Sequence, residues 1–331
     1  MSRGRRRAAL LALALAAGAW WHARPAPAPT TALTIATNTE YLGTCPVMAA
    51  QAHGYFGAER LRVTLQPHSS GRQALNAVLA NRAELATVAD IPVVFAALDG
   101  QPVQILATIF RTGQDHGLVA RRDRGIARAS DLIGKRIGVT LTTSGHFALE
   151  VLLNRQRLDT HDVTLVNYPP EGLLPALASG AVDAVSGWDP FLSRIEEALG
   201  VSTVRFSGRD VYESIYNIVA LRAFLSRHPD TAVRLLRALA QGERYCAAHP
   251  QQAVAFLPRM SPRGRAAALA AWPAHHFGLE LDQSLLLVLE DQARWAIKGG
   301  LGEGDRMPNF LDYIYLDGLK TVSPAAVTIF D

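Results

Sequence analysis

Cysteine is scarce in this sequence: only Cys45 and Cys246 are present, about 200 residues apart along the chain. No metal-ligand spacing stands out, nor does a glycine-rich phosphate-binding loop or a Ser-His-Asp arrangement. The sequence therefore predicts no metal site and no cofactor. It leaves open whether the two cysteines form a disulfide bond or remain two small unpaired residues.

The N-terminus lacks an apolar run long enough to span a membrane. Its apolar stretch, Ala8–Trp21, has 14 residues, whereas a spanning helix needs ~20. Four arginines precede this stretch, and a segment rich in proline and alanine follows it. This order is typical of a secretory signal, so we expect residues 1–28 to be a signal segment and the protein to be periplasmic. An uncleaved signal-anchor is the alternative.

Acidic side chains are absent from residues 1–28, which hold five arginines. The formal net charge of the whole chain is +4, and removing these five positive charges leaves −1. Phosphate backbones are bound by net basic faces. The near-neutral body therefore argues against nucleic acid as a partner.

Short β-rich runs alternate with helical patterns through the rest of the chain. The strand-like runs of the first block are LTIAT (33–37), LRVTLQ (61–66), ELATV (84–88) and VQILATIF (103–110). Helical patterns separate them, which predicts an α/β fold with parallel strands and helices on both faces of the sheet. A second block begins near residue 116, and from about residue 222 the pattern is mostly helical.

The late helices need a surface to cover, and the first block is the expected one. We therefore expect two interwoven lobes: residues 33–115 plus 220–331 form lobe 1, and residues 116–219 form lobe 2. YNIVAL (216–221) is the strand expected to lead the chain back to lobe 1.

Several stretches, taken in order, carry a family resemblance. They are AHGYFGAERLRVTL, ALNAVLANRAELATVADIPVVFAALDG, DLIGKRIGV and ALASGAVDAVSGWDPFL. They resemble the periplasmic substrate-binding proteins of ABC importers for nitrate, sulfonates, taurine and thiamine precursors, and the likeness extends over roughly residues 33–320. The resemblance implies a two-lobed periplasmic-binding-protein type II fold, each lobe a mostly parallel sheet flanked by helices. It also implies ligand capture between the lobes by hinge closure.

Five loops at strand ends are the expected ligand contacts, because ligands of open α/β sheets bind beyond the carboxyl ends of the strands. The residues expected to line the site, with Asn217 near the return strand, are Tyr41, Thr44, Cys45, Ser69, Ser70, Gly71, Asp90, Ile91, Thr142, Thr143, Ser144, Gly145, Trp188, Asp189 and Asn217. The loop 140–146 is the best anion cradle, since hydroxyls and a glycine precede a helix N-terminus.

Each of these loops also has a plain structural interpretation. Ser70 and Asp90 are good helix caps that bond only their own helices, and Trp188 is equally suited to core packing. Arg111, Arg121 and Arg122 are candidate counter-charges for an anion, although the last two are more typical of solvated surface.

Cys45 raises an enzymatic alternative. Some relatives in this superfamily are desulfinases with a catalytic cysteine in the first strand–helix loop, and a helix N-terminus promotes the thiolate. The histidine and arginine of that site would fall near Asn76 and Ala86, which do not match. Another enzymatic branch carries a dense cysteine cluster, which this chain lacks. We therefore expect Cys45 to cap or line the cleft without chemistry.

The sequence as a whole predicts an exported solute-binding protein, not an enzyme. It would capture a small anion of the sulfonate, nitrate or taurine type and deliver it to the permease of an ABC importer. We expect a monomer that does not bind nucleic acid. The alternatives are a desulfinase-like enzyme that uses Cys45 and a membrane-tethered ligand sensor.

Overall fold

The computed structural model describes residues 30–207, 212–257 and 260–330. The predicted signal segment, residues 1–28, lies outside the described residues. In the described part of the chain, no helix combines the length and the apolar character that crossing a membrane requires.

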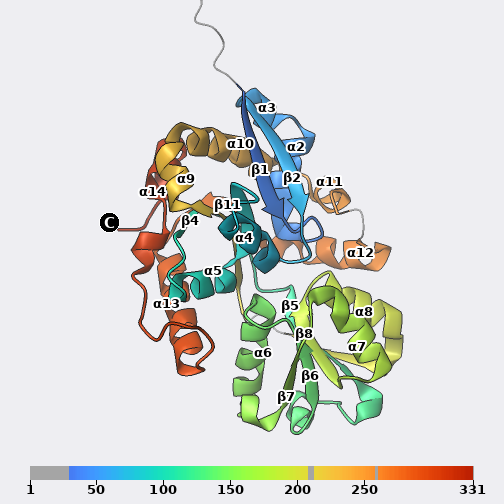
Figure 1. Ribbon diagram of the computed structural model, residues 1–331. Helices are drawn as coiled ribbons and strands as arrows, with labels where there is room; N and C mark the ends of the chain where they lie inside the picture. The colour runs from blue at the N-terminus through green and yellow to red at the C-terminus, as the bar shows by residue number, and fades with distance from the viewer. Residues whose placement is uncertain (1–29, 208–211, 258–259, 331) are drawn as a thin grey trace, which may run out of the picture. The chain divides into compact units, whose positions relative to one another are not determined.

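Two β-sheets organise the described residues (Figure 1). The six-stranded sheet has the order β11-β4-β10-β3-β1-β2. Its strands are β1 (Thr31–Thr37), β2 (Leu61–Pro67), β3 (Leu85–Ala89), β4 (Val103–Thr112), β10 (Ser214–Leu221) and β11 (His275–Glu280). The helices that follow or cover these strands are α2 (Cys45–Ala52), α3 (Tyr55–Ala58), α4 (Gly71–Leu79), α5 (Asp90–Leu98), α9 (Arg222–Arg227), α10 (Pro229–Ala248), α11 (Pro250–Ala255), α12 (Pro262–Ala270), α13 (Gln283–Lys298) and α14 (Leu316–Val322).

The five-stranded sheet has the order β7-β6-β8-β5-β9. Its strands are β5 (His116–Arg121), β6 (Arg136–Val139), β7 (Thr164–Asn167), β8 (Ala184–Trp188) and β9 (Thr203–Phe206). Its helices are α6 (Ser144–Arg155), α7 (Leu173–Ser179) and α8 (Phe191–Leu199). In Figure 1, α6 lies on one side of this sheet and α7 and α8 lie on the other.

Alternation along β5 explains why this sheet has helices on both faces. Leu118 and Ala120 are buried in the cluster that contains the apolar residues of α6. Val119, between them, is buried in the cluster that contains residues of α7 and α8. Successive side chains of a strand point to opposite faces, so an unbroken apolar run requires cover on both sides.

Both sheets contain antiparallel pairs as well as parallel ones. β10 runs antiparallel to both β3 and β4, and β11 runs antiparallel to β4. In the other sheet β5 is antiparallel to β8 and β9, while β6 pairs in parallel with β7 and β8. The reason is the return of the chain: strands that lead into or out of a sheet by a direct crossing run opposite to those joined through helices.

The chain passes between the sheets directly after β4 and again between β9 and β10. The predicted return strand is therefore present as β10, and it pairs in the six-stranded sheet. The division into residues 33–115 plus 220–331 and residues 116–219 stays a prediction, although β10 begins six residues before its boundary at 220.

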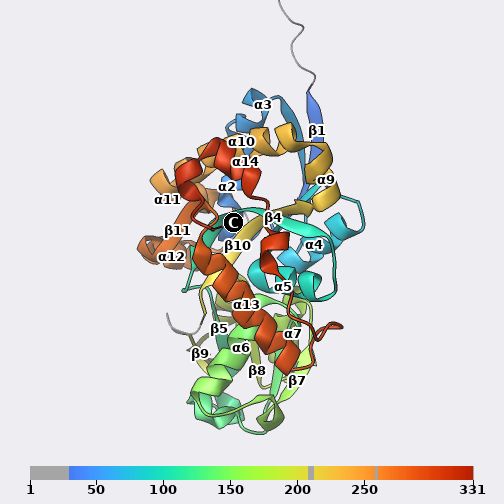
Figure 2. The ribbon, with the colours of Figure 1, turned by 90° about the vertical axis from the view of Figure 1, so that its left-hand side faces the viewer.

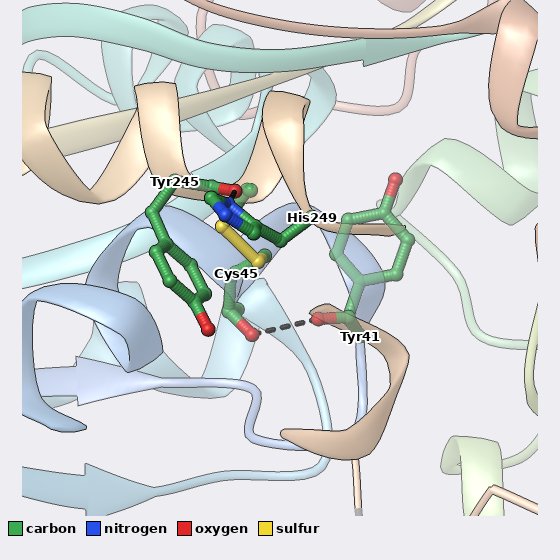
Figure 3. The surroundings of a disulfide bond; sticks show 6 residues. Tyr41, Cys45, Tyr245 and His249 are labelled. Atoms are coloured by element: carbon green, nitrogen blue, oxygen red, sulfur yellow. Dashed lines mark hydrogen bonds between the residues drawn. A yellow bond between two sulfur atoms is a disulfide. The ribbon is translucent and has the colours of Figure 1, made fainter. Parts of the chain in front are cut away.

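A disulfide bond joins α2 to α10, which settles the question that the sequence left open. Cys45 and Cys246 are bonded, with their Cα atoms 6.1 Å apart and both residues buried. Figure 3 shows this bond beside the rings of Tyr245 and His249, which stack with centroids 4.3 Å apart. The two helices are also in close contact at Gly242, where a Cβ would lie 2.1 Å from the Pro46 carbonyl oxygen. The bond therefore ties α10, one of the late helices, to α2 after the first strand.

A buried carboxylate, Asp90 at the start of α5, lies where three distant segments meet. Tyr212, from the return crossing, donates a hydrogen bond to Asp90 Oδ1, and Gln292 of α13 donates to Oδ2 over 2.6 Å. Figure 2 shows α13 running past α5 toward α6, and the Trp295 ring of α13 packs against His146 and Phe147 of α6. Burial raises the pKa of Asp90 to about 6, although hydrogen bonds from Tyr212 and Gln292 act in the opposite direction.

Removal of the disulfide should destabilise the protein. We expect the double variant Cys45→Ala/Cys246→Ala to lose ~2–5 kcal/mol of unfolding free energy, because the bond closes a loop of 201 residues and so restricts the unfolded chain. The check is thermal unfolding with and without dithiothreitol. Reductant should lower the midpoint of the wild type by several degrees and leave that of the double variant unchanged. Equal midpoints for the reduced and oxidised wild type would contradict the prediction.

Asp90 should make stability depend on pH. Its folded pKa of about 6 exceeds the ~3.9 of an unfolded aspartate, so between these values the folded protein holds a proton that the unfolded chain releases. Its contribution to stability therefore falls as the pH rises through that window, by up to ~3 kcal/mol. We expect Asp90→Asn to be more stable than the wild type at pH 8 and nearly equal at pH 4, as measured by urea unfolding.

The chain offers both a partner for the new amide and a control. Gln292 Oε1 has no hydrogen-bond partner among the described residues, so its amide can turn and accept from the new asparagine. Asp99→Asn, at the exposed end of α5, should leave the pH profile of the wild type unchanged. Parallel profiles for the wild type and Asp90→Asn would show that Asp90 does not titrate in this way.

Candidate functional site

A small pocket lies between the two sheets, beyond the carboxyl ends of β1, β3, β6 and β8. Ser70, Gly71 and Arg72 reach it from the N-terminus of α4, and Thr143 and Ser144 reach it from the N-terminus of α6. Its volume is about 20 Å³, which is room for about one water molecule. The two sheets are therefore drawn closely together around these two helix ends.

The N-terminus of α4 is capped and packed closely against β3. Ser70 Oγ accepts a hydrogen bond from the Gln73 amide over 3.2 Å, as predicted for a serine cap. A Cβ at Gly71 would lie 2.9 Å from Val88 Cα, so a residue without a side chain is required there. Arg72 extends to the opposite side of the pocket, where its Nη1 donates to the Leu141 carbonyl over 2.9 Å.

The N-terminus of α6 has no side-chain cap. Thr143 is the N-cap residue, but its hydroxyl donates to the Thr140 carbonyl over 2.7 Å instead of accepting from the helix. The Thr142 hydroxyl likewise donates to the Leu141 carbonyl. The first amides of a helix lack partners in a preceding turn. The His146 and Phe147 amides donate to the Thr143 carbonyl, which leaves the amide of Ser144, a residue that lines the pocket, for a ligand. Such an end, with its positive dipole, favours an anion.

A chain of buried polar side chains begins at the pocket and crosses between the sheets. Ser144 Oγ lies 2.8 Å from His116 Nε2, and His116 Nδ1 lies 2.6 Å from Asp115 Oδ1. Tyr41 completes the chain by donating to Asp115 Oδ2 over 2.6 Å. Burial acts to raise the pKa of the Asp115 carboxyl, but the charge of His116 and the hydrogen bonds of His116 and Tyr41 outweigh it and lower that pKa. Burial, together with the charge of Asp115, holds the pKa of Tyr41 well above its usual value.

Aromatic rings form the walls of the pocket. Tyr41 and Tyr216 meet edge to face, with centroids 4.7 Å apart. Trp188 packs against the start of α6, where a Cβ at Gly145 would lie 3.0 Å from Gly187 Cα and 3.3 Å from the indole. Gly145 therefore permits the close approach of α6 to β8 that brings Ser144 to the pocket.

A second cavity, of about 280 Å³, is lined by Tyr41 and by Asp115. Asp115 lies in the segment that connects β4 to β5. Three of its charged groups, Arg205, Asp189 and Glu196, are paired with one another. Arg205 donates to Asp189 over 2.9 Å and to Glu196 over 3.1 Å. In the described part of the chain, no cluster of three or more His, Cys, Asp or Glu side chains could hold a metal ion.

The structure brings together six of the residues expected at the site. They are Tyr41, Ser70, Gly71, Thr143, Ser144 and Trp188. Asp189 lines the larger cavity instead. Thr143 and Ser144 of the loop 140–146 thus line the pocket, and its role as an anion cradle stays a prediction.

The other expected residues bond elsewhere. Thr44 donates to the Tyr41 carbonyl, Ser69 bonds Gln73, and Thr142 faces a separate surface cavity beside Leu79. Asp90 and Ile91 are fully buried at the start of α5, and Gly145 packs against Gly187 and Trp188 at the end of β8.

Asn217 and Cys45 need correction as ligand contacts. Asn217 is buried inside the sheet, where its Oδ1 accepts from Thr108 over 2.9 Å, because it points across β10 toward β4 and away from the strand end. Cys45 has no free thiol, since its sulfur is bonded to Cys246. The same bond contradicts the desulfinase alternative, which requires a cysteine thiolate.

Arg111, Arg121 and Arg122, the candidate counter-charges, do not line this pocket. Arg111 is buried on β4 and pairs with Glu280 at 2.7 Å and Asp282 at 2.9 Å. Arg121 pairs with Asp123, and Arg122 donates to the Thr203 carbonyl.

Sequence reasoning missed Arg72, Asp115 and His116. Arg72 directly follows the expected Ser69-Ser70-Gly71 loop, so extending that loop by one residue would have found it. Asp115 precedes β5 and His116 begins it, whereas the expected contacts were sought where strands end. No local pattern marks them, because their roles arise from partners at Tyr41 and Ser144.

Comparison with known proteins yields both binding proteins and an enzyme. The taurine-binding periplasmic protein of Escherichia coli (strain K12) is 26% identical over 153 residues, which cover 46% of this chain and 47% of that protein. The chain thus spans about half the length of this curated relative.

Solved structures share the fold. The alkanesulfonate-binding protein SsuA from Xanthomonas axonopodis pv. citri bound to MOPS has a TM-score of 0.76 at 20% identity, covering 87% of this chain and 99% of that one. The desulfurization enzyme DSZB has a TM-score of 0.60 at 17% identity, covering 88% and 98%. The fold of this chain is therefore that of the periplasmic binding proteins.

The two glycines at the pocket should tolerate no side chain. We expect Gly71→Ala and Gly145→Ala each to cost ~1–3 kcal/mol of unfolding free energy, because the added Cβ would meet backbone atoms at 2.9 and 3.0 Å. Gly57→Ala in α3 is the matched control, since no atom lies within 4 Å of its Cβ, and it should be neutral or slightly stabilising. Urea unfolding measures all three. Equal stability of Gly145→Ala and Gly57→Ala would rule out the steric argument.

The match to a family model includes both helix ends at the pocket. The model described as NMT1/THI5 like matches residues 43–253, more than half of the 331 residues. The matched range contains α4, α6 and the strands before them, which build the pocket. The chain therefore belongs to the NMT1/THI5-like family.

Proposed function

We propose that this chain is an exported solute-binding protein that captures a small organic anion, of the sulfonate type, between its two sheets. In the periplasm, the protein would act as a monomer and deliver the anion to the permease of an ABC importer. The observation that carries this proposal is the meeting of two helix N-termini, those of α4 and α6, at one buried pocket.

Electrostatics support an anion in this pocket. Each helix end presents roughly half a positive charge, and Arg72 adds a full positive charge at the rim. A sulfonate has three acceptor oxygens and no donor, which matches a pocket of amides and hydroxyls. The printed names of the taurine-binding and alkanesulfonate-binding relatives support the same ligand class.

Contacts across the pocket support capture by closure. Arg72 of α4 donates to the Leu141 carbonyl on the other side, and Arg194 of α8 pairs with Glu40 after β1 at 2.7 Å. Ser261 also donates to Glu197 of α8. Because a sulfonate is larger than one water molecule, it would enter with the sheets further apart, and these contacts would re-form over it.

The expected activity is binding without turnover. The cysteine nearest the pocket is bonded in a disulfide, so the fold shared with a desulfurization enzyme does not bring that chemistry with it.

A thermal-shift screen tests the proposal. Methanesulfonate, taurine, longer alkanesulfonates, nitrate and small carboxylates are added in turn, and a true ligand should raise the unfolding midpoint by a few degrees at a hundred times its Kd. Arg72→Gln should weaken binding by roughly tenfold to a hundredfold, because it removes a charged donor. Arg62→Gln is the matched control, because Arg62 is an exposed residue of β2. This variant should bind the anion as the wild type does. Failure of every anion to shift the midpoint would refute the proposal.

A further inference from the structure

The hydrogen-bond chain Tyr41–Asp115–His116–Ser144 does more than fill space between the sheets. All four residues are at least nine-tenths buried, and the chain ends at the pocket with the Ser144 hydroxyl. A hydroxyl has one proton to donate, so the group that takes this proton decides what the pocket offers to a ligand.

The protons along the chain can be assigned from the far end. Tyr41 donates to one oxygen of Asp115. The pKa of that carboxyl is lowered by His116 and Tyr41 despite burial, so it is ionised and can only accept. His116 Nδ1, 2.6 Å from the other oxygen, must therefore carry a proton.

His116 Nε2 then has two states, and they reverse the hydrogen bond to Ser144. In the neutral imidazole Nε2 is a lone pair, so Ser144 donates to it and turns hydroxyl lone pairs toward the pocket. In the imidazolium Nε2–H donates to Ser144 Oγ, and the serine proton is free for a ligand oxygen. The first state repels an anion, and the second binds one.

We propose that anion binding in this pocket is coupled to a proton on His116, which acts as a positioning residue by setting the direction of the Ser144 hydroxyl. This inference rests on the proposed function, since it concerns the same pocket. Binding of an anion should take up a proton wherever His116 is neutral in the free protein, so affinity should fall as the pH rises.

The groups that face His116 favour this direction. Asp115 lies against Nδ1, and Asp90 of α5 interacts with the His116 charge. The Tyr212 ring meets His116 edge to face at 4.9 Å, and Trp188 of β8 lies at 6.2 Å. The remaining titratable groups near the chain are Arg72 at the pocket, Tyr41 beyond Asp115, and His275, which interacts with Asp115. Asp115 lies at Nδ1 on one side of the imidazole, and a bound anion would add a negative charge on the Nε2 side, next to Ser144.

Calorimetric titration with methanesulfonate between pH 5 and 9 tests the inference, because this probe stays ionised throughout. In buffers of different ionisation enthalpy, the wild type should take up a fraction of a proton that approaches one where affinity changes most steeply. Affinity should fall by up to tenfold per pH unit in that range. Asp90→Asn controls for the neighbouring carboxyl and should keep the proton uptake.

Two variants separate a proton switch from a structural role. Ser144→Ala should bind about tenfold to a hundredfold more weakly than the wild type at low pH, where a donor is lost. At high pH it should bind equally well or better, because a repelling lone pair is lost, so the two pH profiles should cross. His116→Gln, if folded by circular dichroism, should bind without proton uptake; Ser144→Ala decides the question even if His116→Gln does not fold.

Each other outcome has a definite meaning. Binding by the wild type that is independent of pH, without proton uptake, would overturn this inference and leave the proposed function standing. Binding profiles of Ser144→Ala and wild type that run parallel would also overturn it. Absence of methanesulfonate binding at every pH would count against the proposed sulfonate site and the inference together. Ser144-dependent hydrolysis of p-nitrophenyl acetate would make Ser144 a nucleophile and refute the donor assignment.

Discussion

The buried polar groups at the junction of the two sheets constrain how the sheets meet. Asp115 needs the phenol of Tyr41 and the imidazole of His116, and Asp90 needs Tyr212 and Gln292. A buried carboxylate without such partners would cost several kcal/mol. Since the partners come from the loop after β1, from the return crossing and from α13, satisfying them aligns three remote segments. The pocket lies beside these hydrogen bonds, so they fix the positions of the residues that line it.

The same bonds bear on how the pocket can open. A sheet that moves away from the other breaks hydrogen bonds such as that of Arg72 with the Leu141 carbonyl. Water can replace each of these partners, so the net loss per bond is modest, whereas separation without water would be costly. Separating the two sheets where polar groups meet therefore costs less free energy than separating them through an apolar core. The disulfide joins α2 to α10, and both cysteines belong to the apolar core that contains the six-stranded sheet, so the bond does not link the two sheets to each other.

The sequence was informative wherever a local rule governs the outcome. Alternation and helix signals located β1, β2, β3 and β4. Of the two interpretations left open for Ser70, the structure shows the helix cap, which depends on residues three apart. The strand-end rule found Thr143 and Ser144 for the same reason. It failed at Asn217, because being near a strand end does not say which way a side chain points across the sheet. The antiparallel course of β10, the Cys45–Cys246 bond and the roles of Asp115 and His116 depend on partners between about 30 and 200 residues away, which no window of sequence contains.

The net charge of the groups around the proposed site limits the charge of the anion that it can bind. Two helix ends supply roughly one positive charge between them, and Arg72 adds another at the exposed rim, where water screens it. Asp115 cancels His116 when the imidazole is protonated and leaves a net negative charge when it is not. Asp90 adds a further negative charge above its pKa of about 6. The buried part of the pocket therefore balances at most about one negative charge, and a second would remain uncompensated in a poorly solvated space. An ion with one charge and several acceptor oxygens, such as a sulfonate, satisfies the donors and the charge balance together. A doubly charged oxyanion of similar size satisfies only the donors, so the acidic neighbours of the pocket act in favour of selectivity even though they lower the attraction for any anion.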